Sequence, residues 1–193
     1  MLWQNGSLTD LGILAPYGWS VAQAINDNGL IVGQSASATG EIHAVIWQNG
    51  KIKDLGVLPG GSTVNRSSVA YGVNNAGQVV GSSDVVGGGR HVFLWQAGVM
   101  KDLGTLSGSS GATADAFAIN TVGQIVGSSN SGNGLTRAFI WSSGQYTDLG
   151  TFPTGNVAAA SAINSTGWVA GTSNLKPSGG AYHVTHGALW KTK

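Results

Sequence analysis

The feature that most constrains this chain is a fourfold internal repetition of four short motifs in a fixed order. The first is an apolar pentad ending in tryptophan, such as HVFLW at 91–95, and the second is Asp-Leu-Gly. The third ends in Ile-Asn or Val-Asn, and the fourth is an apolar run that closes on glycine, such as VVG at 79–81. The pentad tryptophans recur every 44 to 49 residues, at Trp3, Trp47, Trp95, Trp141 and Trp190. Such a chain stacks one supersecondary unit several times.

Each motif is an apolar run of about five residues bounded by Gly, Asn or Ser, which is typical of a β-strand and too short for a helix. In the first full unit the four strand positions are A (20–26), B (29–35), C (43–48) and D (51–56). The chain is predicted to be a single all-β domain with repeats at roughly 1–35, 36–82, 83–128 and 129–173, and with 174–193 supplying a closing strand. Its 32 glycines and 9% charged residues suit short, closely packed strands joined by turns.

The connections between strand positions differ in length. The A-to-B joint, such as residues 26–29 (NDNG), and the C-to-D joint, such as 48–50 (QNG), carry the Asn and Gly of tight hairpin turns. The B-to-C and D-to-A joints are longer, for example 57–67. In an up-and-down meander the long loops all lie on one side, and binding is predicted on that long-loop face.

The residue pattern favours a particular stacking of these sheets. Position C is apolar on both faces, position A is rich in small residues, and position D mixes Lys51 and Lys53 into its pattern as an exposed edge does. These features predict a small β-propeller of four four-stranded antiparallel blades, with a closing blade shared by both termini. The alternative is a β-solenoid or an open sheet stack. A closed ring predicts a monomer, whereas an open stack exposes apolar faces and predicts a homo-oligomer.

Composition excludes several classes of partner. The formal net charge is +1 and the charges are scattered, so no nucleic-acid or anionic-membrane footprint is present. Cysteine is absent, which excludes disulfides and thiolate chemistry, and no apolar run reaches the length of a membrane span. The first residues lack the pattern of a signal peptide. No cofactor is predicted.

The repeated phrases AIN-x-x-G-x-VVG, HAFLW-x-x-G and DLG-x-L resemble the HAF-type repeat of bacterial proteins described as probable extracellular repeat proteins. The resemblance covers most of the chain, at 24–33, 43–56, 73–81, 91–104, 118–127, 137–150 and 162–171. Arg137 replaces the first His of the motif, and Gly187 and Ala188 replace its Ala-Phe. The resemblance implies a secreted or cell-surface location and assigns no activity.

The recurring polar residues are interpreted as structural. Asp10, Asp54, Asp102 and Asp148 are expected to accept backbone N–H groups at turns. His43, His91 and His186 begin strand C, one to a repeat, and are expected to be too dispersed for a metal site. No catalytic or metal-binding set is predicted.

Residues that do not recur are better candidates for ligand contact. The predicted ligand-binding residues are Tyr17, Trp19, Arg66, Tyr182 and His183, all on long connections. The predicted function is a non-catalytic extracellular binding or protein-interaction module, with a carbohydrate or a protein as partner. The alternatives are a glycoside-active propeller enzyme, which requires two acidic side chains about 5 to 10 Å apart in a cleft, and a purely structural repeat or assembly unit.

Overall fold

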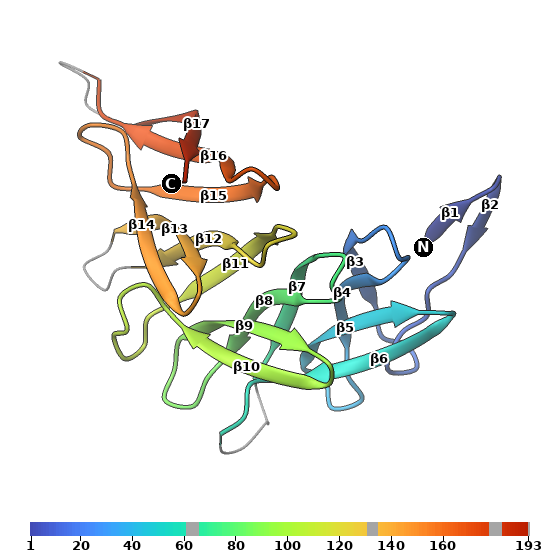
Figure 1. The fold of residues 1–193 in the computed structure, drawn as a ribbon. Helices are drawn as coiled ribbons and strands as arrows, with labels where there is room; N and C mark the ends of the chain where they lie inside the picture. Colours follow the sequence, from blue (N-terminus) through green and yellow to red (C-terminus); the bar gives the residue numbers. More distant parts are fainter. Residues whose placement is uncertain (61–65, 131–134, 178–182, 193) are drawn as a thin grey trace.

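The computed structural model of the protein describes residues 1–60, 66–130, 135–177 and 183–192 (Figure 1). Within these ranges the chain forms seventeen β-strands and no helix, which confirms the all-β prediction. None of the described segments is therefore a helix that could cross a membrane.

The strands are grouped into four successive antiparallel sheets preceded by a short hairpin. The hairpin consists of β1 (Leu2–Gln4) and β2 (Ser7–Thr9). Sheet 1 consists of β3 (Ser20–Ile25), β4 (Ile31–Ala36), β5 (Ile42–Gln48) and β6 (Lys51–Gly56). Sheet 2 consists of β7 (Ser68–Val73), β8 (Val79–Asp84), β9 (Arg90–Gln96) and β10 (Val99–Gly104). Sheet 3 consists of β11 (Ala114–Ile119), β12 (Ile125–Asn130), β13 (Thr136–Ser142) and β14 (Gln145–Gly150). Sheet 4 has three strands, β15 (Ala158–Ile163), β16 (Trp168–Leu175) and β17 (Val184–Lys191).

The first strand of every sheet contains a β-bulge at the same position. In sheet 2, Ala70 pairs with Gly81 and Gly72 pairs with Val80, so Tyr71 between them is an extra residue without a partner in β8. The other sheets have the same register shift, at Gln23, Phe117 and Ser161. A bulge turns the extra side chain out of the ladder and bends the strand. The four bulge residues, Gln23, Tyr71, Phe117 and Ser161, are called the bulge row below.

Successive sheets pack face to face through three apolar clusters. We call the face of a sheet toward the preceding unit its leading face, and the opposite face its trailing face. In β9, Phe93 and Trp95 pack on sheet 1, whereas Val92 and Leu94 pack on sheet 3. The prediction that strand position C is buried on both faces is confirmed.

Tyr146 is partly buried between sheets 2 and 3, and its phenol should make the stability of the protein depend on pH. Tyr146 contacts the Phe139 ring edge-on at 5.0 Å and donates a hydrogen bond to the Gly104 carbonyl. Burial raises the pKa of Tyr146, and nearby Asp102 raises it further. Its contribution to stability is therefore full below about pH 10, the ordinary phenol pKa, and is lost as the pH rises toward the folded-state value.

Tyr146→Phe should accordingly make the free energy of unfolding fall less steeply above pH 10. At neutral pH the lost hydrogen bond should cost about 1 kcal/mol. Denaturant unfolding between pH 7 and 11 measures both effects, and Tyr17→Phe, the same change on an exposed ring, is the control. Parallel profiles for Tyr146→Phe and wild type would contradict the prediction.

The prediction that the termini share a closing sheet is not confirmed. In the described part of the chain, β1 and β2 pair only with each other, and neither strand of the hairpin pairs with sheet 4. Figure 1 shows the sheets along an open arc, with the hairpin at one end and sheet 4 at the other. The closed ring of the predicted propeller is therefore not confirmed by the described residues.

Candidate functional site: the inner face of the arc

The inner side of the arc is formed by the first strand of each sheet. Figure 1 shows β3, β7 and β11 on the inside and β6, β10 and β14 on the outside. At the A-to-B turns a hollow of about 240 Å³ is lined by residues of all four sheets, among them Ile25, Val73, Ile119 and Ile163. The four sheets thus share one inner face, and the bulge row lies along it.

A relay of asparagines joins the sheets at the turn end of this face. The side-chain Nδ2 of Asn26 donates to the carbonyl of Asn74, that of Asn74 to Asn120, and that of Asn120 to Asn164, at 2.9 to 3.1 Å. Each Oδ1 also accepts two backbone N–H groups of its own turn, as Asn120 does from Val122 and Gln124. The predicted hairpin role of these asparagines is confirmed. Their second role, which holds neighbouring sheets in register, was not predicted.

At the centre of the inner face two bulge residues from neighbouring sheets touch. Tyr71 and Phe117 are half-buried, and their rings meet edge to face with centroids 5.5 Å apart. The other two bulge residues, Gln23 and Ser161, are polar and exposed. The pair therefore forms an apolar patch flanked by polar side chains.

An ionic cluster lies beside this aromatic pair. Arg90 contacts Asp84 Oδ1 at 3.3 Å through Nε and Asp115 Oδ1 at 3.4 Å through Nη1. Ser82 donates to the same Asp115 oxygen at 2.6 Å. The three charged side chains are each about 30% exposed, with two carboxylates around one guanidinium. The cluster is thus accessible to a polar ligand and has no excess of positive charge.

The electrostatics of the cluster follow from partial burial. Burial raises the pKa of the Tyr71 phenol, and Asp115 raises it further, whereas Arg90 and Ser82 act in the opposite direction. Burial alone would lower the pKa of Arg90, but its carboxylate partners outweigh that effect and the pKa is raised. At neutral pH the site therefore presents a neutral phenol and a charged guanidinium.

The recurring aspartates and histidines hold the ends of strands C and D together. Asp54 accepts the Gly56 N–H at 2.7 Å with one oxygen and contacts His43 Nδ1 at 2.8 Å with the other. Asp102 and His91 repeat the arrangement, and Arg137 takes the histidine position next to Asp148, at 3.7 Å. The structural interpretation of these aspartates is confirmed. In the described part of the chain, no three His, Asp or Glu side chains are grouped to hold a metal ion.

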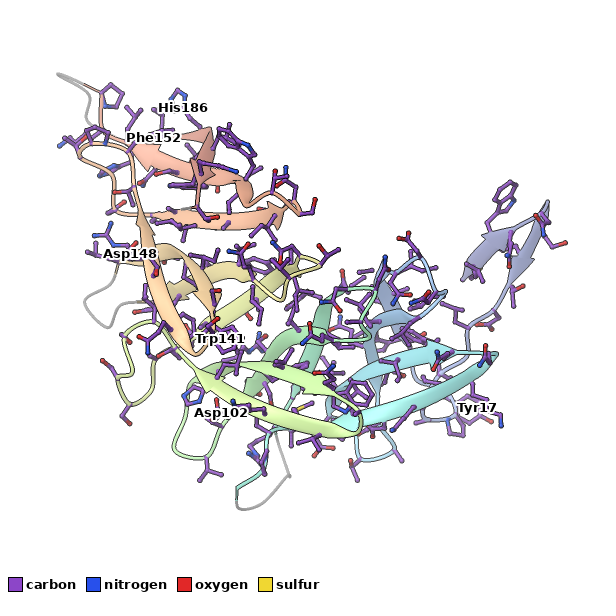
Figure 2. All side chains as sticks on the ribbon, in the orientation of Figure 1. Tyr17, Asp102, Trp141, Asp148, Phe152 and His186 are labelled. Carbon is purple, nitrogen blue, oxygen red and sulfur yellow. The ribbon has the colours of Figure 1, made fainter. Side chains whose placement is uncertain are left out.

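The structure does not bring together the four predicted ligand-binding residues that it describes. Tyr17 is fully exposed on the loop before sheet 1, and Trp19 follows it at 44% exposure. Arg66 is buried, and its Nη1 donates to the Leu58 carbonyl. His183 is exposed just before β17, and Tyr182 lies outside the described residues. Figure 2 shows Tyr17 and His186, which lies three residues after His183 in the sequence, at opposite ends of the arc.

Sequence reasoning missed the bulge row and the Arg90 cluster. A signal for both was available, because the repeats differ in residue type at these positions. Gln23, Tyr71, Phe117 and Ser161 stand at one repeat position, and Asp115 stands where the other sheets have Val or Ala. Variation within an otherwise regular repeat marks side chains that packing does not dictate.

The fold and this site define a class of protein: an all-β repeat protein whose unrepeated side chains gather on an inner face. No protein-family model matches the chain, and none of the curated proteins matches it.

Proposed function

We propose that the protein is a non-catalytic binding module that holds a carbohydrate chain along its inner face. The observation that carries the proposal is the Tyr71–Phe117 pair, which two bulges place on the innermost strands β7 and β11, next to Arg90 and Asp115. Carbohydrates present apolar C–H faces and hydroxyl groups, which match aromatic rings flanked by hydrogen-bonding side chains. Curved repeat proteins commonly bind extended ligands on their concave surfaces.

The charge of the site favours a neutral ligand. Two carboxylates surround the single guanidinium, so a polyanion would be repelled rather than attracted. Catalysis is disfavoured because Arg90 occupies the space between Asp84 and Asp115, and a carboxylate engaged in an ion pair is a poor proton donor. The glycoside-active alternative needs one acidic side chain free to protonate the leaving group.

The same proposal includes the location and the sheet type. A secreted or cell-surface setting, implied by the HAF-type resemblance, agrees with a carbohydrate ligand. We further propose that each sheet is a propeller blade, because all four contribute their first strand to a common inner face. A ring would then require more blades than one chain provides.

The test is a glycan array followed by calorimetric titration of the best ligand. Tyr71→Ala and Phe117→Ala should each weaken binding about 10- to 30-fold, because each removes a central aromatic contact. Ser161→Ala, at the equivalent bulge of sheet 4, is the matched control and should bind nearly as well as wild type. Binding of no glycan, wild-type affinity in Tyr71→Ala, or turnover of a glycan would each overturn the proposal.

A further inference from the structure

The trailing face of sheet 4 is an internal interface without its partner. In sheets 1 and 3 the aliphatic residue preceding the strand-C tryptophan, Ile46 or Ile140, is 6% exposed because the next sheet covers it. The equivalent Leu189 of sheet 4 is 66% exposed. Trp168 is 44% exposed where the equivalent Leu30 is 6% exposed. With Ala162 and Ala170, these side chains line one apolar hollow.

The leading face of sheet 1 is only half covered, and the uncovered half is complementary. Leu2, Leu11 and Leu14 of the hairpin segment pack on the β5 and β6 side of that face, as strands C and D of a preceding sheet would. Next to them an apolar hollow of about 210 Å³ includes Ala22 and Ile25, where strands A and B of a preceding sheet would lie. Ile25 is 56% exposed, whereas the equivalent Ile119 is 8% exposed.

The strand positions present at the two ends of the chain also complement each other. Among the described residues, sheet 4 has strands at positions A, B and C and none at position D. The hairpin has strands at positions C and D, and its β1 pairs with β2 over only three residues, from Leu2↔Thr9 to Gln4↔Ser7. β17 is eight residues long and β1 only three, so β17 can replace β1 beside β2 and extend along the residues that follow β2. One complete four-stranded sheet can therefore be assembled from the two ends.

His186 and Asp10 correspond to the His43–Asp54 pair of sheet 1, but they lie at opposite ends of the chain. His186 occupies in β17 the position of His43 in β5, yet no carboxylate contacts it among the described residues. Asp10 occupies the position of Asp54 and, within the part of the chain that the structure describes, makes only its turn bond to Gly12. The asparagine relay likewise stops at Asn164, whose Nδ2 has no acceptor in the described part of the chain, and starts at Asn26, whose carbonyl receives no relay donor.

We propose that a second copy of the chain covers these ends, head to tail. Sheet 4 of one copy packs its trailing face on the leading face of sheet 1 of the next, and β2 of the next copy becomes the fourth strand beside β17. His186 then pairs with Asp10 of the other copy, and Asn164 donates to its Asn26 carbonyl. The occupant is a second copy because the three internal interfaces show what this kind of face binds. The contact joins unlike surfaces, so it generates rings or chains rather than a pair related by one shared patch.

The decisive experiment mixes two end-blocked variants of the full chain in analytical ultracentrifugation. Leu189→Asp blocks the trailing face and Ile25→Asp blocks the leading face, each on an exposed side chain, and circular dichroism verifies that both fold. Wild type should sediment as concentration-dependent oligomers. Each variant alone should be a monomer, with its dissociation constant raised about 100-fold. An equimolar mixture should give a 1:1 heterodimer and nothing larger, because one intact face of each kind remains.

Further variants test the register. His186→Glu faces Asp10 with a like charge and should weaken association about tenfold. His186→Arg should retain it, as Arg137 replaces histidine next to Asp148 in sheet 3. Val86→Asp, on an exposed loop of sheet 2, is the control for an added charge and should associate as wild type does. A wild type that is monomeric at all concentrations, or end-blocked variants that do not complement each other, would overturn the proposal.

Discussion

Gly127→Ala is expected to destabilise the protein by about 3 kcal/mol, in the upper range for overpacking. A Cβ atom at this position would lie 1.9 Å from the Asp115 carbonyl oxygen and 2.9 Å from the Ala116 Cα. The obstruction is backbone, held in place by the bulge in β11, so it cannot turn aside as a side chain would. Urea unfolding followed by circular dichroism measures the loss.

The matched control is Gly187→Ala. Gly187 lies in β17, nothing lies within 4 Å of its added Cβ, and the equivalent residue in sheet 1 is Ala44. This change should be neutral or slightly stabilising, because glycine weakens a strand interior. A loss below about 1 kcal/mol for Gly127→Ala would show that the bulge relaxes and does not dictate the glycine.

The second large effect is expected for Asn120→Asp, at about 2 to 3 kcal/mol. Asn120 is 4% exposed, and its Nδ2 donates to the Asn164 carbonyl and to Gln124 Oε1. An aspartate keeps the Oδ1 acceptor of the turn but places a buried, charged oxygen against the Asn164 carbonyl. Thermal and urea unfolding at pH 7 report the cost.

Asn164→Asp makes the same change where the relay ends. Asn164 is exposed, and its Oδ1 accepts the Thr166 and Trp168 N–H groups, so the turn is preserved. In dilute, monomeric protein this variant should be within about 0.5 kcal/mol of wild type, as surface substitutions usually are. Equal losses at the two positions would contradict an inter-sheet role for the amide.

The sequence was sufficient to predict the strands, the turns and the double burial of strand C, because each depends on local residue types. Two-residue C-to-D turns, for example, need two left-handed residues, and Ala97 and Gly98 have φ values of 50° and 91°. The alternation of Val92, Phe93, Leu94 and Trp95 likewise indicates two apolar faces without any knowledge of the partners.

The bulges, the asparagine relay and the Arg90 cluster were not predicted. Each depends on how one sheet packs on the next. The sequence identifies Asn74 as a turn residue, but only the structure shows that its side chain donates to the Asn120 carbonyl of the next sheet. Ring closure is not confirmed, and it could not be derived for a related reason. It depends on the angle between neighbouring sheets, and a repeat count says nothing about that angle.

The asparagine relay has a direction, and every junction between sheets has the same one. A whole unit could therefore be lost or duplicated between two sheets without breaking the relay, because every junction uses the same amide-to-carbonyl hydrogen bond. The relay does not involve the bulge row, so each added unit would bring one more bulge side chain to the proposed binding face.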